Sequence, residues 1–320
     1  MRYFVAAIGF LFSLAAAFAA HAQNYPSRPI RMVVIVAPGS AADIIVRLFA
    51  PHMAEGLKQS LLIENRPGAG GSIATGIVKT AKPDGYTILA VSSAHAINAT
   101  LYSQLPYDSV KDFSFIGMCG TSANVLVVTP GLPVRSVSEL IALAKSKPGE
   151  MNIGHTSPGT TVHLSAVLFS MMAGIKVTHV PYKGASELLT DMMSGRLQVT
   201  TASITAAIQS LRSGKLRPLG VTTTQRHQAL PDIPPIADTV PGYEAIVWFG
   251  VIGPAGMPKP IVDTLNRALN EAMRAPEVSA KLVAAGVDPV TTTPEQFAAL
   301  VRSEIPKWGQ VVRESGARVD

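Results

Sequence analysis

Several short turns of small and hydroxyl-bearing residues stand directly before stretches of helical character, and their residue types suit the binding of an anion. A helix N-terminus leaves backbone N–H groups without intrahelical acceptors and carries a partial positive charge. Small side chains let a ligand approach those groups, and hydroxyls add further donors. To these turns we add residues 92–95 at the end of a predicted strand. We therefore predict a ligand site with the candidate residues Gly39, Ser40, Ala41, Asp43, Ser92, Ser93, Ala94, His95, Ser157, Gly159, Thr160, Thr201 and Ser203.

The segment from Val33 to Asp43 is the strongest of these candidates. It begins with a run of β-branched residues, which is typical of a strand buried on both faces, and Pro38-Gly39 ends the run. Ser40 and Asp43 have the spacing of a capping box, which predicts a helix beginning at Ala41. We interpret Asp43 as an organiser of this loop, and contact with a ligand ammonium group is the alternative.

Other chemistries fit the sequence less well. A serine hydrolase would need a serine and a histidine about 3 Å apart. The candidates for such a pair are Ser93, Ser157, His95 and His163. The segment 154–159 has one residue too many for the nucleophile elbow of these enzymes. The histidines show no metal-ligand spacing, so neither a metal nor a cofactor is expected.

Segments with strand character and segments with helix character alternate along nearly the whole chain. This alternation predicts an α/β fold with parallel sheets between helices. The segments near Gly120–Val125 and Pro241–Trp248 are interpreted as crossings between two lobes. We therefore expect one lobe from residues 23–124 and 246–320 and a second lobe from residues 125–245. Two lobes joined by two strands are the plan of a hinged solute-binding protein, and a single doubly wound domain is the alternative.

The N-terminal residues predict export. Met1-Arg2 is followed by an apolar run, and Ala20-His21-Ala22 fits the small-residue pattern that signal peptidase recognises. We expect a signal peptide over residues 1–22 that is cleaved after Ala22. A retained membrane anchor is the alternative.

The composition is that of a globular protein. Hydrophobic residues make up 48% of the sequence, which is enough for a sizeable core in one large domain or two of moderate size. The net charge of +6 is spread along the chain without a cluster of Lys and Arg among aromatic residues, so nucleic acid is not an expected partner. The single cysteine, Cys119, lies in an apolar stretch and is predicted to be a buried small residue.

A series of motifs, taken in order along the chain, resembles the Bug family, the periplasmic receptors of tripartite tricarboxylate transporters. The motifs include ENRPGAGG at residues 64–71, PDGYT at residues 83–87, VPYKG at residues 180–184 and the pair Lys307-Trp308. The resemblance covers essentially the whole chain after the signal peptide. It implies a type II periplasmic-binding-protein fold, in which two Rossmann-like lobes joined by two crossover strands surround a ligand cleft.

The resemblance also implies a function. A receptor of this kind captures a small organic carboxylate between its lobes, largely through loop backbone N–H groups and hydroxyls, and delivers it to the membrane permease of a tripartite tricarboxylate transporter. We expect this chain to be such a receptor, a monomer in the periplasm and not an enzyme. A periplasmic serine hydrolase and a ligand-dependent sensory partner are the alternatives.

Two departures from the family pattern bear on the ligand. Similar receptors usually have two glycines in the first loop, where this chain has Gly39-Ser40. The Ser40 side chain could cap the helix or donate to the ligand. An aspartate is common in the family near residues 198–203, and its absence here favours a ligand without an amino group.

Overall fold

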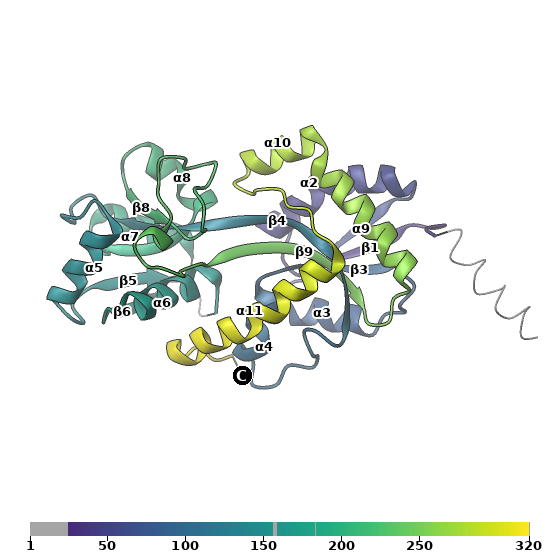
Figure 1. The fold of residues 1–320 in the computed structure, drawn as a ribbon, viewed down its shortest axis with the longest axis horizontal. Helices are drawn as coiled ribbons and strands as arrows, with labels where there is room; N and C mark the ends of the chain where they lie inside the picture. The colour runs from purple at the N-terminus through teal and green to yellow at the C-terminus, as the bar shows by residue number, and fades with distance from the viewer. Residues whose placement is uncertain (1–24, 156–158, 183, 320) are drawn as a thin grey trace, which may run out of the picture.

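The computed structural model of the chain describes residues 25–155, 159–182 and 184–319. The predicted signal peptide with its cleavage site, and the candidate residue Ser157, lie outside the described residues. Figure 1 shows two lobes joined by two long strands, β4 (Phe113–Val128) and β9 (Ile246–Pro254). This is the two-lobed arrangement that the sequence predicts.

The first lobe is a sheet with helices on both faces. In it, β1 (Ile30–Val34) pairs in parallel with β2 (Leu61–Asn65) and β3 (Thr87–Ser92), and β3 pairs antiparallel with β9. Its helices are α2 (Ala41–Leu57), the short η1 (Ala69–Gly71), α3 (Ser72–Lys79), α4 (Ala94–Leu101), α9 (Lys259–Arg274), α10 (Pro276–Ala284) and α11 (Pro294–Ser315). Met32 and Val33 lie in different hydrophobic clusters, so β1 is buried on both faces as predicted.

The second lobe has the same plan with its own sheet. In it, β5 (Asn152–His155) pairs in parallel with β6 (Thr178–Pro181) and β7 (Val199–Ser203). Both β7 and β8 (Arg217–Val221) pair antiparallel with the second half of β4. The helices of this lobe are α5 (Val137–Ser146), α6 (Thr161–Ala173), α7 (Ala185–Ser194), α8 (Ile204–Arg212) and the short η2 (Ile236–Asp238).

The strand β4 passes from one lobe to the other without a break. It pairs with β9 as far as Ala123 and with β7 from Asn124 onward. Val125 and Leu126 lie in separate clusters of the second lobe, which shows that β4 is buried on both faces there. The boundary at residue 125 stays a prediction, because the chain changes lobe within a single strand.

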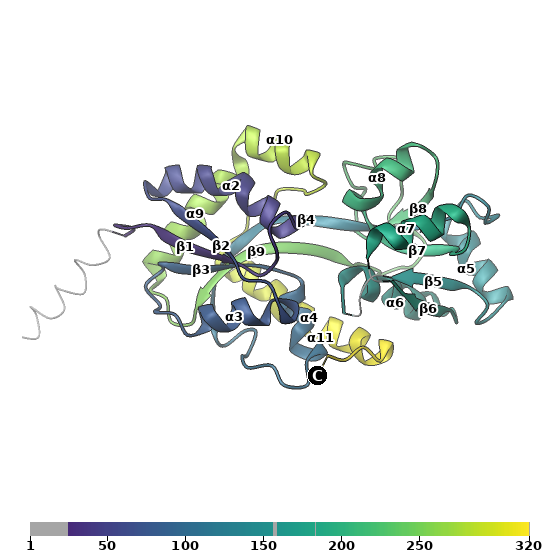
Figure 2. The same cartoon turned by 180° about the vertical axis from the view of Figure 1, so that it is seen from behind.

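The C-terminal helix α11 contacts both lobes. It packs against α4 and β4, and it also packs against α6 of the second lobe (Figures 1 and 2). Trp308 and Val311 of α11 share a hydrophobic cluster with Leu164 and Phe169 of α6. The assignment of residues 246–320 to the first lobe therefore also stays a prediction.

The structure bears on two further features of the sequence. Cys119 lies on β4 and is buried, as predicted, and burial raises the pKa of its thiol to about 12. The thiol therefore stays protonated and unreactive.

Among the described residues, no helix is long and apolar enough to cross a membrane.

Candidate functional site

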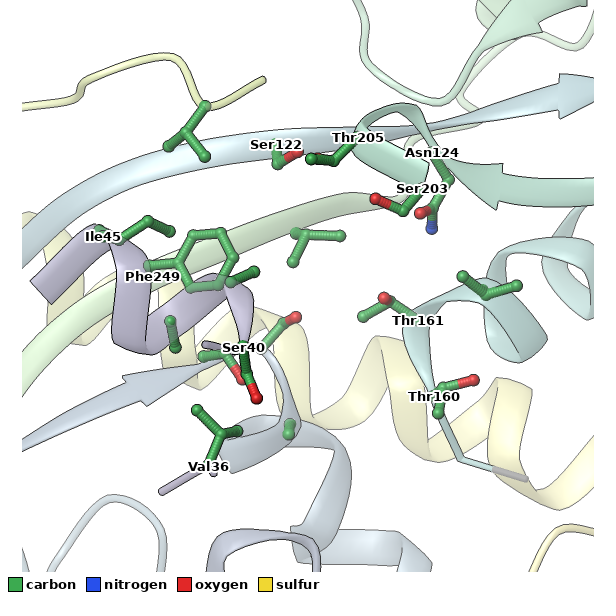
Figure 3. A pocket seen from close by; sticks show the side chains of 18 of the residues that line it. Val36, Ser40, Ile45, Ser122, Asn124, Thr160, Thr161, Ser203, Thr205 and Phe249 are labelled. Carbon is green, nitrogen blue, oxygen red and sulfur yellow. The ribbon is translucent and has the colours of Figure 1, made fainter. Parts of the chain in front are cut away.

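A cavity of about 350 Å³ lies between the lobes. Figure 3 shows that both lobes and both crossover strands contribute side chains to its lining. The predicted site residues that line it are Ser40, Ala41, Ser92, Ser93, Ala94, Gly159, Thr160 and Ser203. The predicted residues outside the lining are Gly39, Asp43, His95 and Thr201. Turns from four distant segments thus meet at one hollow, and their contact with a ligand stays a prediction.

Four helices begin at this cavity, and the N-cap residue of each one lines it. These N-cap residues are Ser40 of α2, Ser93 of α4, Thr160 of α6 and Ser203 of α8. Each helix N-terminus carries roughly half a positive charge. No charged side chain from the described part of the chain lines the cavity. Helix ends, and not cationic side chains, therefore make the cavity favourable for an anion.

Three of the four cap hydroxyls at the cavity differ from that of Thr160 and from those elsewhere, because they make no capping bond within the described structure. Ser136 of α5 and Thr293 of α11, which do not line the cavity, each accept a hydrogen bond from the first turn of their own helix. Within the described structure, Ser40, Ser93 and Ser203 make no such capping bond. The hydroxyls of these three serines, together with the first-turn N–H groups behind them, can therefore serve a ligand.

Asp43 holds the loop that leads into α2. Its carboxylate accepts hydrogen bonds from the Gly39 N–H at 2.8 Å, from Nδ2 of Asn65 at 2.8 Å and from Nε of Arg47 at 2.9 Å. Burial alone would raise the pKa of Asp43, but these hydrogen bonds outweigh burial and hold the pKa below its usual value. The predicted capping box with Ser40 is wrong, because the Ser40 side chain makes no capping bond and Asp43 binds Gly39 instead.

Ser93 is a buried residue whose hydroxyl is unpaired. Its N–H donates to the Trp248 carbonyl at 3.0 Å, which fixes the turn between β3 and α4 to the crossover strand β9. Its hydroxyl oxygen is buried and has no hydrogen-bond partner among the described residues. A buried hydroxyl without a partner lowers stability, by about 1–3 kcal/mol. This hydroxyl at the cavity wall is therefore available to a ligand, and its contact with one stays a prediction.

His95 is buried in the first lobe and does not line the cavity. Its Nε2 lies 2.9 Å from the Ser109 carbonyl, and its ring packs against Tyr107 and Phe113. Burial lowers its pKa to about 4, so the ring is neutral at physiological pH. Its Nδ1 atom is buried without a hydrogen-bond partner among the described residues, and contact of His95 with a ligand stays a prediction.

The loop before α6 carries the corresponding residues of the second lobe. The Gly159 N–H donates to Nδ1 of His163 at 3.1 Å, and the hydroxyl oxygen of Thr160 accepts from the His163 N–H at 3.3 Å. Thr201 lies behind this loop, where its hydroxyl donates to the Val162 carbonyl at 2.5 Å. His163 and Thr201 therefore position the loop, while Gly159 and Thr160 face the cavity.

The arrangement does not support the hydrolase alternative. The Ser93 hydroxyl has no histidine partner within the described residues, and the Nδ1 atom of His163 accepts a backbone N–H. Ser157 lies outside the described residues. No group of three or more His, Cys, Asp or Glu side chains in the described ranges is placed to hold a metal ion.

Several residues of the lining were not predicted from the sequence. They are Ser122, Ala123 and Asn124 on β4, Val247 and Phe249 on β9, Thr205 on α8 and Val287 after α10. The helix α4 was not expected from the sequence, which predicted only a strand end at residues 92–95. The crossing segments near residues 120–125 and 241–248 were recognised as hinges, and a hinge between lobes is a place where ligands bind.

The comparisons with known proteins agree with this geometry. The family model TctC, the tripartite tricarboxylate transporter family receptor, matches residues 45–317. Protein BugT of Bordetella pertussis is 35% identical over 301 residues, which cover 93% of this chain and 92% of BugT.

Two solved structures are also similar. Rpa4515 of R. palustris, solved with adipate, is 36% identical with a TM-score of 0.77, covering 92% of this chain and 100% of that one. MatC of Rhodopseudomonas palustris, solved with bound malate, is 30% identical with a TM-score of 0.73, covering 90% of this chain and 100% of that one. These likenesses confirm the predicted Bug resemblance and the periplasmic-binding-protein fold. The family consists of solute receptors and not of enzymes. The chain belongs to the TctC family of tripartite tricarboxylate transporter receptors.

Proposed function

We propose that this chain is a periplasmic receptor that captures a small organic carboxylate in the cavity between its lobes. The observation that carries the proposal is the meeting of four helix N-termini at a cavity that no charged side chain of the described residues lines. The similar proteins Rpa4515 and MatC were solved with adipate and with malate, which are both carboxylates.

The strength of such a site can be estimated from its parts. A helix N-terminus contributes about 0.3–1 kcal/mol to anion binding, and a hydrogen bond to a charged group contributes about 1.5–3 kcal/mol. A micromolar dissociation constant corresponds to about 8 kcal/mol. Three or four donors from the two lobes, acting together on one ligand, are therefore sufficient without an arginine.

The remaining parts of the proposal concern export and delivery. The N-terminal residues 1–22 act as a signal peptide cleaved after Ala22, and the mature chain works as a monomer without a cofactor. The loaded receptor delivers its carboxylate to the membrane permease of a tripartite tricarboxylate transporter. The membership of the chain in the receptor family of these transporters supports this step.

A thermal-shift screen with purified mature protein tests the proposal. A ligand at a hundredfold excess over its dissociation constant stabilises the folded state by about 2.7 kcal/mol. Native mass spectrometry of protein from cells grown on mixed carboxylates provides a second measurement, because a retained ligand reveals its mass. A folded protein that no mono-, di- or tricarboxylate stabilises would contradict the proposal.

Two serine variants separate binding from folding. Ser93→Ala removes a buried hydroxyl that has no partner in the described structure, so we expect the ligand-free protein to gain up to about 1–3 kcal/mol of stability. The same variant should bind the ligand about 10–100-fold more weakly. Ser136→Ala removes a capping bond far from the cavity, so we expect about 1 kcal/mol less stability and unchanged affinity. The reverse pattern would show that Ser93 is structural.

A further inference from the structure

The cavity has a floor made by the two crossover strands. Val247 and Phe249 alternate along β9, and both side chains line the cavity. In the pairing of β4 with β9, Val247 lies opposite Ser122 and Phe249 lies opposite Gly120. A Cβ on Gly120 would lie 2.7 Å from Cγ1 of Val287, so Val287 packs onto this glycine and extends the apolar surface. We call Val247, Phe249 and Val287 the apolar floor.

Polar groups border the apolar floor on the sides of both lobes. Ser40 and Ser93 stand at the N-termini of α2 and α4 in the first lobe, and Thr160 and Ser203 stand at the N-termini of α6 and α8 in the second lobe. Figure 3 shows Ser40 below Phe249, and Thr160 and Ser203 across the hollow from it. Each lobe thus presents two positive helix ends, which is a place for one carboxylate on each side.

The two hydroxyls next to the floor already donate hydrogen bonds within the protein, and the Asn124 side chain, further along β4, donates to Oγ of Ser165 at 3.3 Å. The Ser122 hydroxyl donates to the Gly286 carbonyl at 2.8 Å, and the Thr205 hydroxyl donates to the Ala285 carbonyl at 3.4 Å. The backbone groups of β4 and β9 are engaged in their antiparallel ladder. A polar group on the middle of a ligand would therefore lie against carbon and lose its hydrogen bonds to water.

We propose that the apolar floor selects linear dicarboxylates whose carbon chain carries no hydroxyl or amino group. This inference rests on the proposed function, because it names the class of carboxylate that the same cavity takes. The unpaired, buried hydroxyl of Ser93 marks the first-lobe end of the ligand. The carboxylate at the other end meets Thr160 and Ser203 when the lobes close.

Matched ligand pairs test the selection directly. Isothermal titration with succinate and malate, glutarate and 2-hydroxyglutarate, and adipate and 3-hydroxyadipate compares molecules that differ by one hydroxyl. In each pair of which at least one acid binds, we expect the unsubstituted acid to bind at least about tenfold more tightly than the hydroxylated acid. This ratio corresponds to about 1.4 kcal/mol. Butyrate, which lacks the second carboxylate of succinate, is expected to bind at least about tenfold more weakly than succinate.

A pair of isosteric variants then assigns the selection to the floor. Val247→Thr adds a hydroxyl on the floor, and threonine is well tolerated in a strand. We expect this variant to reduce the ratio of the malate and succinate dissociation constants at least about threefold. Val177→Thr makes the same change in a half-buried residue that does not line the cavity. This control is expected to leave the preference unchanged.

The outcomes separate the two proposals. The selection is refuted if the hydroxylated acids bind as tightly as their unsubstituted partners. It is also refuted if butyrate binds as tightly as succinate. In both cases the receptor function stands. If none of these acids and no other carboxylate binds to folded protein, the proposed function itself fails. The role of the floor would also be refuted if Val177→Thr reduced the preference for unsubstituted acids as much as Val247→Thr does.

Discussion

Replacing Gly159 by alanine tests how the cavity loop of the second lobe is held against the first lobe. Gly159 has a φ of +77°, and a Cβ at this position would lie 2.3 Å from Cδ2 of Leu101 and 3.0 Å from Cδ1. Leu101 is 5% exposed and lies in the cluster that α4 shares with α6 and α11, so its methyl groups have little room to move.

The expected loss has two parts. A left-handed backbone costs an alanine about 1–2 kcal/mol, and overpacking a core costs about 1–3 kcal/mol. We therefore expect Gly159→Ala to lower the free energy of unfolding by about 2–5 kcal/mol. Because Gly159 also lines the cavity, the same variant should weaken carboxylate binding.

Gly174→Ala is the matched control, and urea denaturation measures both variants. Gly174 has a φ of +61°, but no other described atom lies within 4 Å of a Cβ placed there, so only the backbone part of the loss is expected. In the double variant Gly159→Ala/Leu101→Ala the loss should be smaller than the sum of the single losses, because the shortened side chain leaves room for the new methyl group. Equal losses in the two glycine variants, or an additive double variant, would refute this reasoning.

Two other predictions concern acid stability and the first loop. The pKa values of His95, His163 and His179 are lowered to about 4, 3 and 4, chiefly by burial, from 6.5. The unfolded chain therefore binds protons below about pH 6.5 that the folded chain does not bind. The free energy of unfolding should fall as the pH falls from about 6.5 towards 4, by up to about 3 kcal/mol for His95 alone. A urea concentration at the midpoint of unfolding that did not change between about pH 7 and 5 would contradict this. Asp43→Ala leaves three donors without their acceptor, the Gly39 N–H among them, so we expect about 2–4 kcal/mol less stability together with weaker ligand binding. Denaturation and calorimetry would measure the two effects, and binding unchanged in Asp43→Ala would show that this loop does not form the site.

The sequence predicted the parts of the site that depend on local structure. The turn after β1 was recognisable because β-branched residues, then Pro38-Gly39, then Ser40 mark a strand, a turn and a helix start within a few residues. The same local pattern identified Thr160 and Ser203, which proved to be N-cap residues at the cavity, whereas Ser93 was predicted from its place at a strand end and the helix that it caps was not expected. Local chemistry therefore gave three of the four helix ends correctly.

The details that depend on long-range contacts were not predictable in this way. The spacing of Ser40 and Asp43 suggests a capping box, but Asn65 and Arg47 draw the carboxylate to the other side of the loop, where it binds Gly39. Asn65 is 22 positions away in the sequence, so no local pattern reveals its contact with Asp43.

The apolar floor depends on pairing over an even longer range. The faces of Val247 and Phe249 are fixed by the register of β9 against Ser122 and Gly120 of β4, more than a hundred residues earlier. A single sequence contains no local signal for this register. The crossover could therefore be recognised as a hinge, but the side chains that it turns towards the ligand could not be identified.

In the proposed site, the division of the helix N-termini between the lobes would link ligand affinity to closure. Ser40 and Ser93 belong to one lobe, while Thr160 and Ser203 belong to the other, so only a closed receptor brings all four helix ends to one ligand. A buried arginine would keep most of its attraction for a carboxylate after the lobes separate, because its charge would stay on one lobe. Separating the lobes here removes two of the four helix ends, and each end acts only within its first turn. We infer that an uncharged cavity suits a receptor that must release its ligand whenever the lobes are drawn apart.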